Sequence, residues 1–170
     1  MKIDWQVISR QYGPLVWRTA YRLVGTEADA ADCFQETFIC ALDFSKRQEV
    51  HNWAGLLQRL ATARSLDLLR KRKREMRSRV NEAEWDRVAS GEIGPDRQAQ
   101  DSELMESLRA AITKLPAQQG EIFCLRYLNG LSYEEIAEEI GTSVDSVGVS
   151  LHRAKSRLRE LLVSACAEER

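Results

Sequence analysis

Three carboxylates in the string ADAADCFQETF fall on one face of an expected helix. Asp29, Asp32 and Glu36 are spaced by three and four residues, which brings their side chains together on a helix surface. Grouped carboxylates can hold a metal ion or transfer a proton. No histidine ligand or phosphate-binding loop accompanies them, and two phenylalanines point the other way. We therefore expect the acidic rim of a protein-docking face, with a plain solvated face as the alternative.

A dense group of cations follows at residues 59–74. Cations near a helix C-terminus are favourable through the helix dipole, but this group is larger than capping needs. We expect a surface that follows phosphates. Trp53 precedes it, and this side chain either stacks on unpaired bases or belongs to the core. The cations are Arg59, Arg64, Arg70, Lys71, Arg72, Lys73 and Arg74.

The C-terminal part carries the signals of a helix-turn-helix. Ser132 and Glu135 have capping-box spacing, Gly141 permits a sharp turn, and Ser143 can cap a final helix. Apolar residues then recur in steps of three and four, and a short helix, a turn and a long helix are what this motif requires. An ordinary helical hairpin is the alternative. The apolar positions are Val144, Val147, Leu151, Ala154, Leu158 and Leu161.

The first half of this last helix offers little charge to DNA. Its outward positions include Gly148, Val149 and Ser150, whereas Arg153 and Arg157 lie in the second half. Phosphate contacts position a protein and base contacts specify the sequence. We expect the helix to dock on the DNA backbone through its basic half and to read bases with small groups, unless the basic half is simply solvated.

Charge is distributed unevenly along the 170 residues, although the formal net charge is only −1. Residues 1–74 have a net charge of +5, residues 75–113 of −4, and residues 114–170 of −2. The four cysteines form no CxxC pair, so neither a zinc site nor a disulfide framework is expected. No apolar run is long enough to cross a membrane and the N-terminus does not resemble a signal peptide, which favours a cytoplasmic protein.

Helical periodicity recurs and strand patterns are almost absent, which predicts an all-α fold. We expect two small helical domains, residues 1–74 and 96–170, joined by a flexible linker over 75–95. Gly25 is expected to end the first helix and Thr26 to cap the second. The residues expected to face the first core are Trp17, Tyr21, Val24, Ala31, Phe34, Phe38, Ala41, Leu42, Leu57, Leu60, Ala61 and Leu68.

Three strings, in this order, resemble the bacterial RNA polymerase sigma factors of the sigma-70 family, group IV or extracytoplasmic function (ECF) type. ADAADCFQETF resembles region 2.2, which docks on the polymerase. LLQRLATARSLDLLRKRKR resembles regions 2.3 and 2.4, which melt and read the downstream promoter element. LPAQQGEIFCLRYLNGLSYEEIAEEIGTSVDSVGVSLHRAKSRLREL resembles region 4, a helix-turn-helix that binds the upstream element.

The resemblance implies a transcription initiation factor and not an enzyme, with no cofactor. Its partners would be core RNA polymerase, through the clamp helices of the largest subunit and the flap, promoter DNA, and an anti-sigma factor. The polymerase contacts would be Asp29, Asp32, Gln35 and Glu36. Downstream DNA would contact Trp53, Arg59, Ala63, Arg64, Arg70 and Lys71. Upstream DNA would contact Arg126, Tyr133, Ser146, Gly148, Val149, Ser150, His152, Arg153, Lys155 and Arg157.

Some positions depart from the family pattern. Ala63 stands where many members have asparagine, and Gly148 to Ser150 stand where a basic residue, serine and arginine are usual. The promoter preference of better-known relatives therefore does not transfer to this chain. Two other readings remain: a dimeric helix-turn-helix regulator that binds operators, although no heptad seam for dimerisation is visible, and an enzyme with a metal at Asp29, Asp32 and Glu36.

Overall fold

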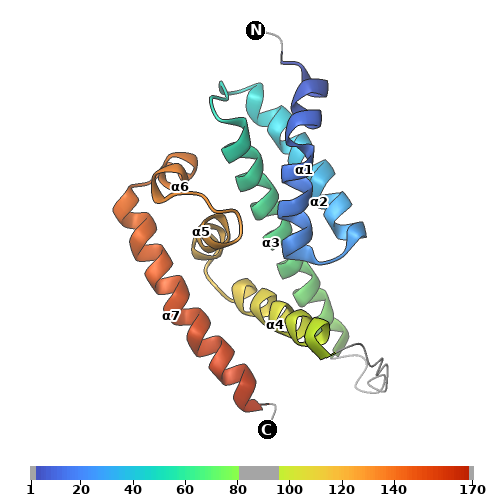
Figure 1. Cartoon of the computed structure of the whole chain (residues 1–170), viewed down its shortest axis with the longest axis vertical. Coiled ribbons are helices and arrows are strands. Elements are labelled where there is room, and N and C mark those ends of the chain that lie inside the picture. Colours follow the sequence, from blue (N-terminus) through green and yellow to red (C-terminus); the bar gives the residue numbers. More distant parts are fainter. Residues whose placement is uncertain (1–2, 81–95, 169–170) are drawn as a thin grey trace.

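The computed structural model describes residues 3–80 and 96–168, and every regular element in those ranges is an α-helix (Figure 1). The first unit contains α1 to α3 and the second unit contains α4 to α7. This confirms the expected all-α fold. The helices are α1 (Trp5–Val24), α2 (Glu27–Ser45), α3 (Trp53–Val80), α4 (Asp96–Thr113), α5 (Ala117–Tyr127), α6 (Tyr133–Ile140) and α7 (Val144–Glu168).

The junction between α1 and α2 follows the sequence prediction. Gly25 has a φ of 78°, a left-handed conformation that favours glycine, and its N–H bonds to the carbonyl of Tyr21. Thr26 then caps α2, accepting a hydrogen bond from the N–H of Asp29. The two helices are thereby joined by a turn of only two residues, which folds α2 back against α1.

The face of α1 that packs on α2 and α3 differs from the expected one. Val16 and Ala20 are fully buried, whereas Trp17 is 37% exposed and Tyr21 is 44% exposed. On α2, the small side chains of Ala30 and Cys33 are the buried ones. Small residues let the helix axes approach closely, and the large aromatics are displaced to the rim of the contact. The expectation that Trp17 and Tyr21 face the core was therefore wrong.

The second unit contains the predicted helix-turn-helix in α6 and α7. Ser132 and Glu135 form a complete capping box, and Gly141 ends α6 with a φ of 75°. The Ser143 hydroxyl accepts a hydrogen bond from the N–H of Ser146 at 3.1 Å and so caps α7. The predicted apolar steps are confirmed for the four central positions, Val147, Leu151, Ala154 and Leu158. Val144 is exposed instead.

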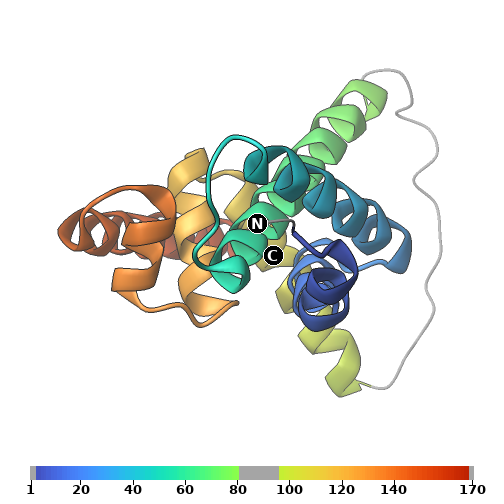
Figure 2. The ribbon, with the colours of Figure 1, turned by 90° about the horizontal axis from the view of Figure 1, so that it is seen from above.

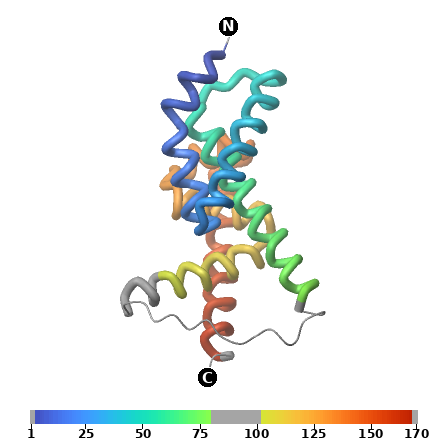
Figure 3. Tube along the Cα trace, turned by 90° about the vertical axis from the view of Figure 1, so that its right-hand side faces the viewer, coloured from blue at the N-terminus to red at the C-terminus, as the bar shows by residue number. Residues whose placement is uncertain are grey.

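The third helix is longer than the sequence predicted. Residues 75–80, which were assigned to the linker, continue α3 for more than one further turn. The rest of the predicted linker, residues 81–95, lies outside the described part of the chain. The basic end of α3 therefore projects as helix beyond the three-helix bundle (Figure 3).

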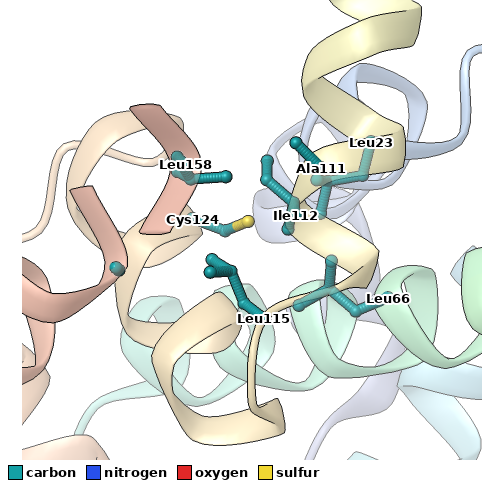
Figure 4. Close-up of a cluster of buried hydrophobic side chains, with 8 residues drawn as sticks. Leu23, Leu66, Ala111, Ile112, Leu115, Cys124 and Leu158 are labelled. Atoms are coloured by element: carbon teal, nitrogen blue, oxygen red, sulfur yellow. The ribbon is translucent and has the colours of Figure 1, made fainter. Parts of the chain in front are cut away.

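The two units share one hydrophobic core, which the sequence could not predict. Leu23 of α1 and Leu66 of α3 pack with buried residues of α4, α5 and α7 (Figure 4). Seen from above, α5, α6 and α7 lie to one side of α3, whereas α4 lies on the other side, toward α1 (Figure 2). The partners of Leu23 and Leu66 in this cluster are Ala111, Ile112, Leu115, Cys124, Ala154 and Leu158.

Candidate polymerase and nucleic-acid interfaces

The four residues expected to contact polymerase are not equivalent in the structure. Asp32, Gln35 and Glu36 are exposed along α2, whereas Asp29 is only 4% exposed. The Asp29 carboxylate accepts a hydrogen bond from the Thr26 hydroxyl at 2.7 Å and forms an ion pair with Arg72 of α3. Asp29 therefore ties α2 to α3 and is not available to a partner in this arrangement.

The same geometry bears on the alternative that Asp29, Asp32 and Glu36 bind a metal ion. With Asp29 turned inward and Asp32 and Glu36 exposed, the three carboxylates do not converge. In residues 3–80 and 96–168, no group of three or more His, Cys, Asp or Glu side chains is arranged to hold a metal ion.

An apolar groove lies beside the exposed acidic residues, between α1 and α2. Phe34 and Phe38 line it with ring centroids 4.9 Å apart, and Ile39, which also lines it, is exposed. The sequence analysis missed this groove, although Phe34 and Phe38 do pack against the first core as it expected. The aromatic residues could be recognised in the sequence, but the exposed fraction of each side chain depends on how closely α1 and α2 approach. The lining residues are Trp5, Ser9, Phe34, Gln35, Phe38, Ile39 and Leu42.

Arg59 of α3 faces the second unit. Its Nε lies 3.2 Å from Glu121 Oε1 of α5, and its guanidinium also donates to the carbonyl of Glu139 at the end of α6. Burial raises the pKa of the Glu139 carboxyl, and the nearby positive charge of Arg59 partly offsets that rise. The residue expected to contact downstream DNA is thus held by groups of its own chain.

The other residues expected at downstream DNA are dispersed around α3. Trp53 packs edge-on against Trp5 with ring centroids 5.5 Å apart, which places it in the first core. Arg64 and Arg70 flank Asp67 at 4.0 and 3.7 Å. Ala63 is half-buried and Lys71 is exposed. Trp53 is only partly buried there, and its contact with downstream DNA stays a prediction.

The projecting end of α3 is strongly positive. The pKa of Lys73 is lowered, first by burial and then by the neighbouring charges of Lys114 and Arg77. A lysine pKa falls in this way where cations gather, because each positive charge disfavours another. Lys71 and Arg74 are exposed on the same segment. This end of α3 is therefore exposed and positively charged, and its contact with DNA phosphates stays a prediction.

The outward face of α7 is open to solvent. Val149, His152, Arg153 and Arg157 are exposed, whereas the Lys155 ammonium lies 5.2 Å from the centroid of the Tyr127 ring. Arg157 also lies 3.5 Å from Glu160, an exposed pair that contributes little to stability. Ser146 takes part in the cap of α7, and Gly148 and Ser150 are half-buried between these positions.

Arg126 and Tyr133 hold the helix-turn-helix together. Arg126 Nη1 donates to the carbonyl of Leu131 at 2.9 Å, and its guanidinium lies over the Tyr133 ring, 5.4 Å from the centroid. A Cβ added at Gly148 would lie 3.8 Å from that ring. The two residues therefore position α6 against α5 and α7, a role that the sequence analysis did not assign to them.

A hollow where α4, α5 and α7 meet adds one cation, Lys114, that the sequence analysis missed. Lys114 lies there with Arg153 and Arg157 of α7. Pro116 begins α5 without a side-chain cap, so N–H groups of the first turn remain open to an anion. The signal in the sequence was the Lys114 to Pro116 segment before a helix. The hollow is lined by Lys114, Leu115, Pro116, Gln119, Arg153, Ser156, Arg157 and Glu160.

No helix in the described part of the chain has the length and apolar character needed to span a bilayer.

Comparisons with known proteins match both units. Residues 8–75 match the family model "Sigma-70 region 2" and residues 105–158 match "Sigma-70, region 4". The ECF RNA polymerase sigma factor SigE of Mycolicibacterium smegmatis is 34% identical over 97% of this chain. This chain spans 64% of the length of that relative. EcfG of Rhodopseudomonas palustris, another ECF sigma factor, is 30% identical over 88% of this chain and 80% of its own length.

Solved structures agree with these matches. The sigma factor RpoE of Bartonella quintana, solved in complex with the anti-sigma factor NepR, has a TM-score of 0.53 and 25% identity, covering 94% of this chain and 96% of that one. CnrH, solved with the cytosolic domain of CnrY, has a TM-score of 0.59 and 21% identity, covering 94% and 87%. With both units matched in order and with a relative of 30% identity aligned over most of its length, the chain belongs to the ECF group of the sigma-70 family of RNA polymerase sigma factors.

Proposed function

We propose that this chain binds core RNA polymerase and directs it to promoters for transcription initiation. The observation that carries the proposal is the apolar groove between α1 and α2 with exposed Asp32, Gln35 and Glu36 beside it. Exposed apolar residues that adjoin one another and have polar residues at their rim can mark a site where a partner binds. An amphipathic partner helix with basic residues at its edge fits both parts, and the clamp helices of the largest polymerase subunit are the proposed occupant.

Upstream DNA binding is assigned to α7. Its exposed basic residues, together with Lys114 and the open N-terminus of α5, form a surface for the DNA backbone. Val149 and His152 are exposed on the half of the helix that would face base edges. Val149 offers only apolar contact, such as with a thymine methyl, and His152 offers a hydrogen bond. Specificity at the upstream element would therefore be modest.

Downstream DNA is assigned to α3 and its projecting end. Polymerase supplies the chemistry, and the chain supplies position, because it binds polymerase and DNA at the same time. Joining two weak contacts in one molecule raises the effective concentration of each. The protein would act in the cytoplasm, where the polymerase works. The Bartonella quintana relative, solved with the anti-sigma factor NepR, supports the proposal of an anti-sigma partner for this chain.

Transcription on pooled genomic fragments tests the proposal. The chain is added to core polymerase, and the 5′ ends of the transcripts are sequenced. We expect new start sites that share a motif in two parts, and the upstream part shows what α7 reads. A matched variant, Asp32→Asn with Glu36→Gln, is expected to lose these starts while keeping the fold. Starts that persist in this variant at full strength would contradict the α2 docking surface, and the absence of starts with active core polymerase would contradict the function.

A further inference from the structure

A pocket of about 330 Å³ lies where the C-terminal half of α3 meets α4 and the turn between α1 and α2. In this region α4 packs beside α3 (Figure 1), and Lys73 of α3 donates a hydrogen bond to Thr113 Oγ1 of α4 at 3.3 Å. Val24 and Thr26 also line the pocket. Small-molecule sites usually have volumes of roughly 300–1,000 Å³, so this pocket is large enough for a small ligand.

Positive charge outweighs negative charge in the lining of the pocket. The lining contains three cations, Arg72, Lys73 and Arg109, and one carboxylate, that of Glu106. Lys73 is half-buried, and within residues 3–80 and 96–168 no ion pair joins it to a carboxylate. Burial and then the charges of Lys114 and Arg77 lower the pKa of its ammonium group. An anion bound beside Lys73 would offset this repulsion.

The Arg109 guanidinium is held in position by its own chain. Its Nη1 lies 2.9 Å from Glu106 Oε1, and its Nη2 donates to the carbonyl of Arg22 at 3.0 Å. The Arg109 side chain is 16% exposed, whereas that of Glu106 is 70% exposed, so water screens the carboxylate. A ligand would therefore meet a cation that is already ordered and only partly neutralised.

Arg72 is fixed from the opposite direction along the chain. Its guanidinium pairs with the buried carboxylate of Asp29, while the Arg72 side chain itself is partly exposed. A guanidinium has five N–H donors, so those that Asp29 does not use can donate to a second anion. Arg72 and Arg109 are thus both held by groups behind them, one from α2 and the other from α1 and α4.

The same face of α3 also carries apolar side chains. Leu69, Lys73 and Met76 follow one another in steps of four and three residues, and all three line the pocket. Met76 is 67% exposed although it is a large hydrophobic residue. Its flexible thioether suits a flat apolar group, because methionine adapts its shape to what it contacts. A bare phosphate would use the cations and leave these apolar side chains without a partner.

We propose that this pocket binds a nucleotide. The phosphates would lie against Lys73, Arg72 and Arg109, and the base would lie against Leu69 and Met76. The Glu106 carboxylate would accept hydrogen bonds from the sugar hydroxyls, as acidic residues do in other nucleotide sites. A ligand with a charged end and a flat apolar end matches the two kinds of lining, which neither an inorganic anion nor an apolar molecule does.

The site is separate from the surfaces proposed above. None of the residues assigned to polymerase, to downstream DNA or to upstream DNA lines this pocket. Lys71 and Arg74, which lie on the same segment of α3, are exposed and also do not line it. The inference therefore goes beyond the proposed function and does not depend on it.

Calorimetric titration of the full chain with ADP tests the proposal, at roughly 0.15 M salt, where charges more than about 8 Å apart are largely screened. Pyrophosphate and adenosine are titrated separately as the two parts of the probe. We expect one ADP per chain, and weaker binding of either part by about tenfold or more. Absence of ADP binding would overturn the site, and pyrophosphate that binds as tightly as ADP would overturn the role of the apolar side chains.

Lys73→Gln removes the half-buried cation and is expected to weaken ADP binding by about tenfold or more. Lys71→Gln is the matched control, because it removes the same charge from an exposed position on the same helix. We expect less than about a twofold change in the control. Equal losses in the two variants would show a general attraction of phosphates, including those of DNA, to the end of α3, and would overturn the pocket.

A second pair of variants covers the case in which Lys73→Gln fails to fold. Met76→Glu places a negative charge in the lining at an exposed position, and Ser78→Glu places the same charge on another face of α3. Circular dichroism without ligand checks that both proteins are folded. We expect Met76→Glu to weaken ADP binding by about threefold to tenfold and Ser78→Glu to change it by less than about twofold. Unchanged affinity in folded Met76→Glu would overturn the proposal.

Discussion

Arg59 Nε lies 3.2 Å from Glu121 Oε1, and this ion pair joins α3 of the first unit to α5 of the second. The Arg59 side chain is 34% exposed and that of Glu121 is 19% exposed, so water screens the pair in part. We expect Glu121→Gln to lower the free energy of unfolding by about 1 kcal/mol or less. Urea unfolding followed by circular dichroism measures the change. The exposed Glu134→Gln on α6 is the control, and an equal loss there would contradict the assignment.

Asp29 and Asp32 lie about one turn apart on α2, but the same substitution is expected to have different effects at the two positions. Asp29→Asn removes the charge that pairs with Arg72 and weakens the hydrogen bond from Thr26. We expect it to lower the free energy of unfolding by about 1–3 kcal/mol. Asp32→Asn changes an exposed side chain and is expected to shift stability by less than about 0.5 kcal/mol.

For polymerase binding, we expect the larger effect from the substitution of Asp32 and the smaller one from that of Asp29. Asp32→Asn weakens co-elution with core polymerase, whereas folded Asp29→Asn protein binds almost normally. Chemical unfolding and size-exclusion chromatography with core polymerase give the two readouts. A stable Asp29→Asn protein that has lost polymerase binding would show that the carboxylate of Asp29 reaches the partner after all.

Gly148 does not owe its place in α7 to close packing. An added Cβ would lie 3.8 Å from Tyr133 Cε2, which is ordinary van der Waals contact. Since alanine is better than glycine within a helix, we expect Gly148→Ala to stabilise the chain by up to about 1 kcal/mol. The thermal midpoint should rise by about 2–4 °C, a shift that calorimetry can resolve. A fall would mean that the backbone of α7 bends at this position.

Arg153 is expected to contact a phosphate of upstream DNA. Removing one phosphate contact lowers affinity uniformly across sequences and reduces the slope of log K against log salt by about 1. We therefore expect Arg153→Ala holoenzyme to bind promoter DNA more weakly with that smaller slope. Arg159→Ala removes an equal charge from α7 outside the assigned contacts and serves as the control. Equal slopes for the two variants would indicate a general effect of charge.

Cys124 should resist alkylation in the folded chain. Burial raises the pKa of its thiol to about 12, so near pH 8 almost none is present as the reactive thiolate. Cys166 is exposed and should react first with iodoacetamide. Peptide mass spectrometry after timed alkylation distinguishes the two, and denaturant should abolish the difference. Early modification of Cys124 would show that the shared core opens often.

The helix ends and the helix-turn-helix could be predicted from the sequence because local signals determine them. Gly25, Thr26, the Ser132–Glu135 box and Gly141 act within a few residues of the chain, and each is where the sequence placed it. The end of α3 was missed because residues 75–80 are mostly charged or polar and carry no apolar stripe. An exposed helix of that kind leaves no apolar stripe to recognise.

The roles of single side chains were harder to predict, because they depend on which helices meet. Hydrophobicity assigned Trp17 and Tyr21 to the core, but both are exposed and small residues such as Ala20 are buried instead. Acidity and spacing grouped Asp29 with Asp32, yet only the position of Arg72 shows that Asp29 faces inward. Likewise, the contact between Arg59 and Glu121 joins residues 62 positions apart. No local sequence pattern predicts such a pair.

Leu23 and Leu66 also limit how freely the halves of this protein can be exchanged with those of its relatives. A chimera that receives a foreign second unit would acquire the upstream preference of the donor, but both leucines would face a surface that did not evolve against them. Such a hybrid would recognise the upstream element of the donor, but the contact between its two units would be weaker. The second unit contains Ala111, Ile112 and Leu115, which pack with these leucines. Exchanging positions 23 and 66 together with that unit would keep the two halves matched. The unit of modularity in this molecule is therefore larger than either of its domains.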